Sequence, residues 1–235
     1  MQRMIHITSP VFLREPAAIQ YGIPAVFPQP ERPLHLEIGC GTGDFVVELA
    51  QRSPEINFLA IDIFNKGCSK TCNKTTAAGL ENIRVMRTEA RYLLTRLLPA
   101  ESLDAIYVNC PDPWPKKRHR YRRLVNRDFF PLLQHALIPG GEFFFVTDFG
   151  DYAEQVAELL PTLNEFDNQL DSPYATDFPD YPVSKYMKRF LDLGQNLHYI
   201  HLQKKLDALP GDPPAPTSSR GFRINWEERE AAKSP

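Results

Sequence analysis

Short β-rich apolar runs alternate with amphipathic helical segments through the middle of this 235-residue chain. Strands that alternate with helices are typical of a parallel sheet wound in both directions. We therefore expect an α/β fold: a Rossmann-like, doubly wound, mainly parallel seven-stranded sheet with helices on both faces. The pattern locates strands at 34–38, 57–63, 83–87, 103–109, 142–147 and 196–203, and helices at 44–51, 66–78, 90–98, 128–137 and 151–160.

The size and hydrophobic content allow one sizeable domain of this kind. Hydrophobic residues make up 43% of the chain and charged residues 24%, which is ordinary for a globular protein and excludes disorder of the whole chain. We expect the α/β domain at 34–206, after an N-terminal extension at 1–33. Five of the 22 prolines fall in 207–235. That segment is predicted to be a flexible tail, in which Phe222, Ile224 and Trp226 are the side chains able to pack or dock.

The sequence also bears on compartment. No apolar run approaches the ~20 residues of a membrane span, and residues 1–15 lack the apolar core of a signal peptide. We predict a cytoplasmic protein without a membrane partner, whose four cysteines are reduced thiols. Cys68 and Cys72 lie four residues apart without further Cys or His nearby, so they predict core packing and no metal site.

A glycine-rich loop follows the first expected strand. Gly39, Gly41 and Gly43 alternate with Cys40 and Thr42. Glycine lets the backbone turn sharply and approach a ligand without a Cβ in the way, whereas a plain strand-to-helix turn needs only one glycine. In doubly wound sheets, ligands bind beyond the carboxyl ends of strands. The strand ends of interest are Gly39, Asp62, Glu89 and Asn109.

The spacing of the glycines discriminates between ligands. In a dinucleotide-binding loop the third glycine would fall at Asp44, where a carboxylate repels a pyrophosphate, so a dehydrogenase is disfavoured. The loop instead resembles motif I of class I S-adenosylmethionine-dependent methyltransferases, whose cofactor carries a sulfonium and an ammonium that favour nearby acids. Asp62 is placed to hold two ribose hydroxyls, with capping of the next helix as its structural alternative. Glu37 is placed for the methionine end of the cofactor, and Glu89 for the adenine.

The loop after the fourth expected strand holds an acidic residue between two prolines. Pro111 and Pro113 restrict the backbone around Asp112. A rigid loop at the carboxyl end of a strand is suited to hold a reactive group. The alternative is a plain surface turn.

A basic segment comes directly after that loop. Residues 116–127 hold seven Lys or Arg and no acid, whereas the rest of the chain carries 20 basic and 29 acidic groups. Residues 151–180 alone hold eight acids and no Lys or Arg. The near-zero net charge of −2 therefore conceals a strongly basic patch. Although many charge runs are only solvated faces, this one adjoins the candidate site and favours a nucleic-acid partner.

These motifs together resemble the bacterial tRNA (guanine-N7)-methyltransferases over about residues 34–205. The resemblance rests on the sequences at 36–39, 111–114, 116–123, 147–148, 184–186 and 193–194, of which Pro-Asp-Pro-Trp followed by Lys-Lys-Arg-His is the most specific. It implies methyl transfer from S-adenosylmethionine to N7 of a guanine in the tRNA variable loop, at position 46.

The resemblance also implies roles for individual residues. Asp112 matches the catalytic Asp. The positions implied to contact the cofactor are Glu37, Gly39, Gly41, Gly43, Asp62, Glu89 and Asp112. The positions implied to contact the substrate or RNA are Lys116, Lys117, Arg118, His119, Arg120, Arg122, Arg123, Asp148, Ser184, Lys185, Tyr186 and Met187.

The segment after Ser184 departs from the family pattern. Met187 stands where the family has Glu, Phe190 where it has Gly, and Gln195 where a His is frequent. A carboxylate can accept hydrogen bonds from the donor edge of guanine, which a methionine cannot do. We therefore expect base recognition to shift to Asp112 and Asp148.

Two other classes of function remain open from the residues. A methyltransferase acting on a small molecule or a protein explains the glycines but not the basic segment. An S-adenosylmethionine-binding protein with a different RNA target, or with RNA-binding activity alone, is consistent with the changes at Met187 and Phe190. The sequence leaves the oligomeric state open.

Overall fold

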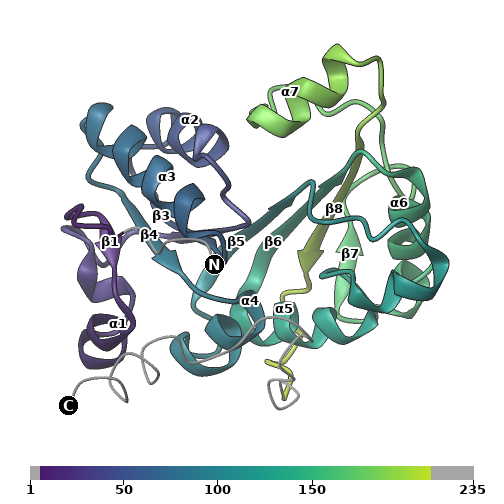
Figure 1. Cartoon of the computed structure of the whole chain (residues 1–235). Coiled ribbons are helices and arrows are strands. Elements are labelled where there is room, and N and C mark those ends of the chain that lie inside the picture. Colours follow the sequence, from purple (N-terminus) through teal and green to yellow (C-terminus); the bar gives the residue numbers. More distant parts are fainter. Residues whose placement is uncertain (1–5, 213–235) are drawn as a thin grey trace.

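The computed structural model describes residues 6–212, which build one eight-stranded sheet in the order β1-β4-β3-β2-β5-β6-β8-β7 (Figure 1). β1 to β6 all run parallel to one another, whereas β8 is antiparallel to both β6 and β7. The strands are β1 (Phe12–Leu13), β2 (Leu34–Ile38), β3 (Asn57–Asp62), β4 (Ile83–Arg87), β5 (Leu103–Asn109), β6 (Leu137–Thr147), β7 (Phe166–Asn168) and β8 (His198–Lys204).

The doubly wound α/β class and all six located strands are confirmed, but the count of seven strands is wrong. Two strands are present besides the six that the sequence located. These are β1 and β7, which are two and three residues long and lie at opposite edges of the sheet. Such short runs carry no period of their own and become strands only because β4 and β8 present partners.

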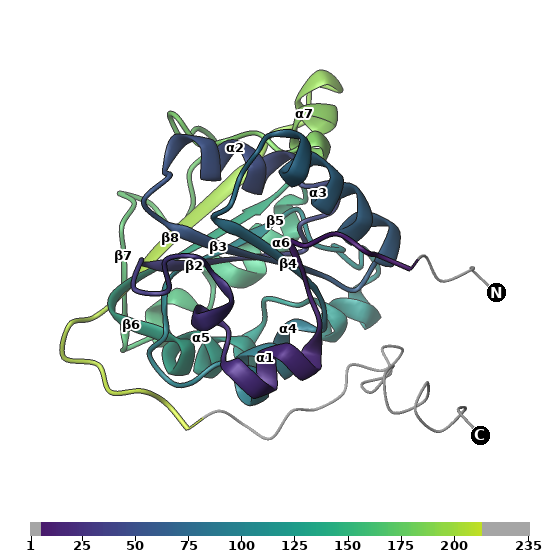
Figure 2. The same cartoon turned by 90° about the vertical axis from the view of Figure 1, so that its left-hand side faces the viewer.

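Helices cover both faces of the sheet (Figures 1 and 2). α2 and α3 lie on one face, whereas α1, α4, α5 and α6 pack on the other. α7 is raised beyond the carboxyl ends of the parallel strands, across from α2. The helices are α1 (Glu15–Tyr21), α2 (Asp44–Arg52), α3 (Asn65–Ala77), α4 (Ala90–Tyr92), α5 (Phe130–Ala136), α6 (Gly150–Ala157) and α7 (Lys185–Asp192). Short 3-10 or π turns are η1 (Pro24–Val26), η2 (Leu93–Leu97), η3 (Lys117–Arg122), η4 (Arg127–Phe129) and η5 (Leu160–Thr162).

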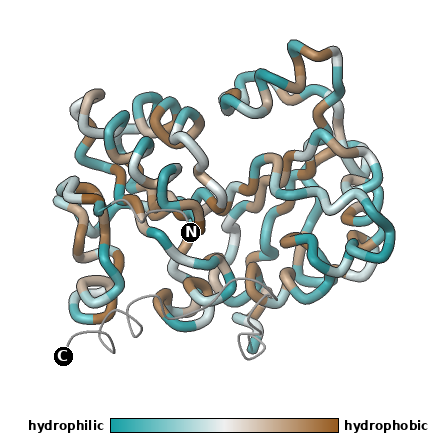
Figure 3. Tube along the Cα trace, in the orientation of Figure 1, coloured by the Kyte–Doolittle hydropathy of each residue, from teal (hydrophilic) through white to brown (hydrophobic). Residues whose placement is uncertain are grey.

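The core is divided between the two faces by the alternation of side chains along each strand. Leu36 of β2 and Leu59 of β3 pack toward α4 and α5, whereas Phe58 and Ala60 of β3 pack toward α2 and α3. Figure 3 shows hydrophobic residues gathered along the central strands. This two-sided burial leaves the carboxyl ends of the strands as the place where polar side chains collect.

The helix expected at 90–98 is divided between α4 and η2, and the boundaries around Leu137 also differ from the sequence expectation. The helix expected at 128–137 is divided between η4 and α5, and β6 begins at Leu137 instead of 142. Gly140 and Gly141 therefore lie within β6, whose pairing with β5 changes register between Leu103 and Ala105. An irregularity of this kind lets a strand continue through residues that ordinarily signal a turn.

The segments flanking the expected domain also contact it. The N-terminal extension supplies β1 and α1, and β1 pairs with β4. At the other end, Gln134 donates to the Leu209 carbonyl at 3.0 Å and the His135 ring lies 2.9 Å from the Gly211 carbonyl. The remainder of the tail, including Phe222 and Trp226, lies outside the described residues.

The structure also bears on membrane spans and metal sites. Within residues 6–212, no helix has the length and apolar character needed to cross a membrane. The same part of the chain holds no group of three or more His, Cys, Asp or Glu side chains able to bind a metal ion. All four cysteines are free thiols, three of them buried.

Candidate functional site

The glycine-rich loop connects β2 to α2 through three left-handed residues. Gly39, Gly41 and Gly43 have φ angles of +83°, +54° and +79°, which glycine adopts without strain. A Cβ on Gly43 would lie 2.7 Å from Cγ2 of Thr71 in α3, whereas one on Gly39 would meet nothing within 4 Å. Gly43 thus allows two helices to pack closely, and Gly39 leaves open space at the end of β2.

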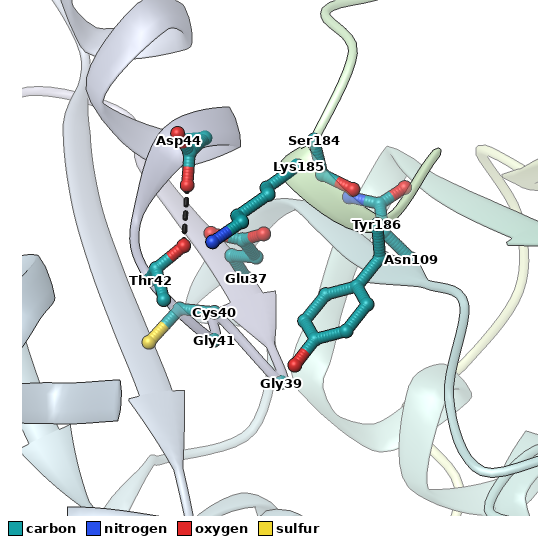
Figure 4. Close-up of a pocket in the computed structure, with 10 residues that line it drawn as sticks. All are labelled: Glu37, Gly39, Cys40, Gly41, Thr42, Asp44, Asn109, Ser184, Lys185 and Tyr186. Atoms are coloured by element: carbon teal, nitrogen blue, oxygen red, sulfur yellow. Dashed lines mark hydrogen bonds between the residues drawn. The ribbon is translucent and has the colours of Figure 1, made fainter. Parts of the chain in front are cut away.

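A pocket opens over this loop, with α7 on its far side (Figure 4). Ser184, Lys185 and Tyr186 reach it from the beginning of α7, and the side chain of Lys185 extends over it. These three predicted residues are thereby brought together with Glu37, Gly39 and Gly41, although about 145 positions of sequence separate them. The pocket is lined by Glu37, Gly39, Cys40, Gly41, Thr42, Asp44, Asn109, Ser184, Lys185 and Tyr186.

Glu37 and Asn109 give the pocket its chemical character. Glu37 is only 3% exposed, and burial raises its pKa to about 8. The neighbouring Asn109 side chain acts against this rise in pKa, yet Glu37 Oε2 and Asn109 Nδ2 are buried and meet no partner with hydrogen-bond geometry in the described part of the chain. Tyr181 donates to Oδ1 of Asn109 at 2.9 Å, which fixes the amide. Since buried polar atoms are normally paired, the two atoms fit a ligand that carries both a donor and an acceptor.

Two further acids predicted to contact the cofactor, Asp62 and Glu89, have structural partners. Asp62 accepts from the backbone N–H groups of Gly41, at 2.9 Å, and Phe64, at 2.7 Å, and burial raises its pKa. Asp62 therefore shapes the glycine-rich loop as well as the beginning of α3. Glu89 caps α4 by accepting from Tyr92 N at 2.9 Å. Neither acid lines the pocket of Figure 4, so their contacts with a cofactor remain predictions.

The Asp112 loop carries backbone strain on both sides of the acid. Cys110 and Trp114 have φ angles of +45° and +42°, unusual values for residues with side chains. Cys110 N donates to the Val146 carbonyl at 2.8 Å, and Trp114 N donates to Oδ1 of Asp112 at 3.2 Å. Asp112 itself is exposed. Strain of this kind is retained at functional sites when the surroundings enforce it, which favours a functional role for the loop.

The basic segment folds into η3 beside Trp114. The Arg122 guanidinium lies 4.8 Å from the Trp114 ring and 5.6 Å from the Tyr121 ring, while His119 packs edge-on to Trp114 at 5.8 Å. Arg120 pairs with Asp151. The cationic side chains of the segment that remain exposed are those of Lys116, Lys117, Arg118, Arg122 and Arg127.

Two of the predicted substrate-binding residues face the interior. The Arg123 side chain is fully buried and bonded to protein groups, so it is not accessible to RNA phosphates. Met187 is also fully buried and packs with Val146, Leu197 and Tyr199. The expectation of substrate contact is corrected for both. The Met187 side chain instead packs in the hydrophobic cluster that holds α7 against the rest of the protein.

Asp148 follows β6 directly and is half-buried, which raises its pKa. Four residues that line the pocket are not among the site residues expected from the sequence: Cys40, Thr42, Asp44 and Asn109, the last of which is one of the strand ends of interest. Asn109 is detectable only through its pairing: β5 lies beside β2, so its last residue ends near Glu37. Cys40 and Thr42 lie between the glycines.

Comparison with known proteins bears directly on the family. Residues 31–200 match the family model described as "Putative methyltransferase". The tRNA (guanine-N(7)-)-methyltransferase of Syntrophotalea carbinolica is 53% identical over 96% of this chain and 97% of its own length. The enzyme of the same name from Geobacter metallireducens is 45% identical over 87% of this chain and 97% of its own.

Solved structures support the fold. The 16S rRNA methyltransferase KamB superposes with a TM-score of 0.55 at 14% identity, covering 74% of this chain and 88% of that one. Similarity at this level of identity concerns the fold alone. Together with the length of the match to the sequence relatives, it leads to one conclusion: the chain belongs to the tRNA (guanine-N(7)-)-methyltransferase family.

Proposed function

We propose that this chain is a cytoplasmic enzyme that transfers a methyl group from S-adenosylmethionine to N7 of a guanine in tRNA, at variable-loop position 46. One arrangement supports this most directly. Asn109, the last residue of β5, lines the pocket that holds the unpaired acid Glu37. The chain after Asn109 continues through the strained Asp112 loop into the exposed cations of η3. A cofactor pocket, an acid and a surface for phosphates thus follow one another along the carboxyl edge of one sheet.

The pocket residues fit this cofactor. Glu37 Oε2 offers an acceptor to the ammonium of the methionine end, and Asn109 Nδ2 offers a donor to its carboxylate. The left-handed backbone at Gly39 leaves room for the ligand, since no atom lies within 4 Å of the position of a Cβ. Asp62 would hold the ribose hydroxyls while keeping its bond to Gly41 N.

The chemistry requires positioning more than proton transfer. When bound, S-adenosylmethionine supplies an electrophilic methyl carbon, which the N7 lone pair attacks as the bond to sulfur breaks. Because N7 carries no proton, the protein needs no general base. Asp112 accepts hydrogen bonds from the N–H groups of the guanine and offsets the positive charge that develops on the purine.

The exposed cations orient the RNA. Lys116, Lys117, Arg118 and Arg122 extend from the segment that follows Asp112 and bind backbone phosphates. The acid-rich surface at 151–180 repels a polyanion, so the field directs RNA toward the Asp112 side. With Met187 buried, Asp148 is the second acid available for base recognition.

The test is to incubate the protein with methyl-labelled S-adenosylmethionine and unmodified tRNA, and to map the product by nuclease digestion and mass spectrometry. The expected product is 7-methylguanosine at position 46 only. A tRNA with that guanine replaced by adenine is the matched control and is expected to accept no label. Methylation at another base, or cofactor binding without any transfer, would overturn the assignment.

A further inference from the structure

We propose that Arg123 is a positioning residue for methyl transfer, which fixes the backbone of the Asp112 loop against α6 from inside the protein. This proposal rests on the role proposed above for Asp112. Sequence places Arg123 in a run of cations beside Arg122, but the two residues differ in environment: Arg122 is exposed and Arg123 is 0% exposed.

The contacts of Arg123 point in two directions. Its Nε donates to the carbonyl of Pro113 at 2.8 Å, and Pro113 directly follows Asp112 in the chain. Its Nη1 donates to Gln155 Oε1 at 2.6 Å and to the Asp151 carbonyl at 3.2 Å, and Nη2 donates to Asp151 Oδ2 at 2.6 Å. The guanidinium thus joins the Asp112 loop to α6.

The orientation of the guanidinium is itself fixed. It lies 4.7 Å from the Tyr152 ring and 5.6 Å from the Phe149 ring. Tyr152 accepts a hydrogen bond from Val125 N at 2.8 Å, so the chain after Arg123 is also held to α6. A planar guanidinium with several directed donors can hold the loop and α6 at a fixed separation and orientation, which a lysine ammonium cannot do.

The loop needs such support because it is strained. Cys110 and Trp114 hold left-handed backbone angles on the two sides of Asp112. Conformations of this kind persist only when surrounding contacts enforce them. The first side is held by Cys110 N on Val146, and the second by Arg123 on Pro113. Without the second contact, the loop is free to relax and the Asp112 carboxylate moves with it.

The same contact relates Asp112 to the other candidate acid. Asp148 lies three residues before Asp151 and directly before Phe149, whose ring faces the guanidinium. Arg123 therefore sets the separation between the Asp112 loop and the segment that carries Asp148. Catalysis by positioning is sensitive to displacements of about 1 Å, so we expect the loss of this contact to appear in turnover.

The experiment compares Arg123→Lys with Arg122→Lys and Arg122→Met under saturating tRNA and cofactor. We expect Arg123→Lys to lower kcat at least tenfold while tRNA affinity, its salt dependence and cofactor affinity stay within twofold of wild type. Arg122→Met is expected to weaken tRNA binding and to flatten its salt dependence. If Arg123→Lys behaves like Arg122→Met, Arg123 contacts RNA and the proposal is wrong.

A second comparison keeps the proposal testable if Arg123→Lys unfolds. Gln155→Ala removes one acceptor of Arg123 on the far side from the loop, and it is expected to lower kcat several-fold without changing tRNA affinity. An unchanged kcat would overturn the proposal. Hydrogen–deuterium exchange at 110–116 should rise in both variants, a readout that does not depend on activity.

The two proposals fail in different ways. If wild-type protein does not methylate tRNA, the proposed function is wrong whatever Arg123 does. If wild type is active, Arg123→Lys is combined with Asp112→Asn. A residue that acts through Asp112 has little further effect once Asp112 is changed, so full additivity of the two losses would contradict a positioning role.

Discussion

Glu37 at β2 and Asn109 at the end of neighbouring β5 each present a buried, unpaired side-chain atom to the same pocket. One atom is an acceptor, Oε2, and the other is a donor, Nδ2. Leaving such a group unpaired costs about 1–3 kcal/mol, so the pair disfavours the empty pocket and favours an amino-acid-like ligand.

Replacing Glu37 by Gln is expected to weaken cofactor binding by about 1.5–3 kcal/mol at pH 8, because a charge-assisted hydrogen bond to the ammonium is lost. The pKa of about 8 means that Glu37 in the free protein is mostly protonated at pH 6 and ionises as pH rises. Affinity should therefore increase from pH 6 to pH 8 in wild type relative to Glu37→Gln. Isothermal titration calorimetry measures both, and the difference between the variants removes the titration of the cofactor itself. Parallel pH profiles would argue against a contact with Glu37.

Replacing Asp112 by Asn should lower kcat by about 10²–10³-fold, the usual effect of removing a group that stabilises transition-state charge. Asp112 is exposed and does not line the pocket of Figure 4, so cofactor affinity should change little. Single-turnover methylation of tRNA and calorimetry separate the two effects. Near-normal turnover would remove Asp112 from the mechanism.

Replacing Lys116, Lys117 and Arg118 together by Met should weaken tRNA binding and flatten its salt dependence. Each lost phosphate contact lowers the magnitude of the slope of log K against log salt by about 0.7–0.9. Filter binding between about 50 and 200 mM salt measures the slope. Lys205→Met is the control, because Lys205 follows β8, which is antiparallel to β6 and therefore ends away from the carboxyl ends of the parallel strands. An unchanged slope in the triple variant would exclude this segment from the RNA interface.

Replacing buried Lys204 by Met should destabilise the fold by about 3–5 kcal/mol. Lys204 Nζ donates to the carbonyls of Gln134 and Leu137, at 2.8 and 2.9 Å, and to Glu101 at 3.0 Å. These bonds fasten β8 to the end of α5 and the beginning of β6. Urea denaturation measures the change. Lys205→Met, one residue further along, should stay within about 0.5 kcal/mol of wild type.

Replacing Gly43 by Ala should destabilise the protein and impair cofactor binding, because the new Cβ meets Thr71 at 2.7 Å in a left-handed position. Gly79→Ala is the matched control: its φ is +66° but its Cβ meets nothing within 4 Å. The control isolates the backbone cost of about 1–2 kcal/mol. Thermal unfolding with and without cofactor distinguishes the variants, and equal losses would show that packing against Thr71 contributes nothing.

Features that depend on local pattern can be predicted from the amino-acid sequence. The alternation of apolar runs and helices gave the parallel sheet, and the spacing of Gly39, Gly41 and Gly43 located the loop over which the pocket opens. Asp112 between its two prolines and the cations that follow it could also be recognised from the sequence, since each of these motifs spans no more than a dozen residues. Family membership followed from the same motifs.

Whether a side chain of a local run faces the solvent or the core depends on tertiary contacts. Arg122 and Arg123 are adjacent and chemically identical, yet the 3-10 turn and the acceptors on α6 bury one and expose the other. In the same way, Met187 points into a core formed with β6 and β8, and Ser184 to Tyr186 reach a loop that lies 140 positions earlier. Such outcomes depend on partners brought by remote segments, which no local period encodes.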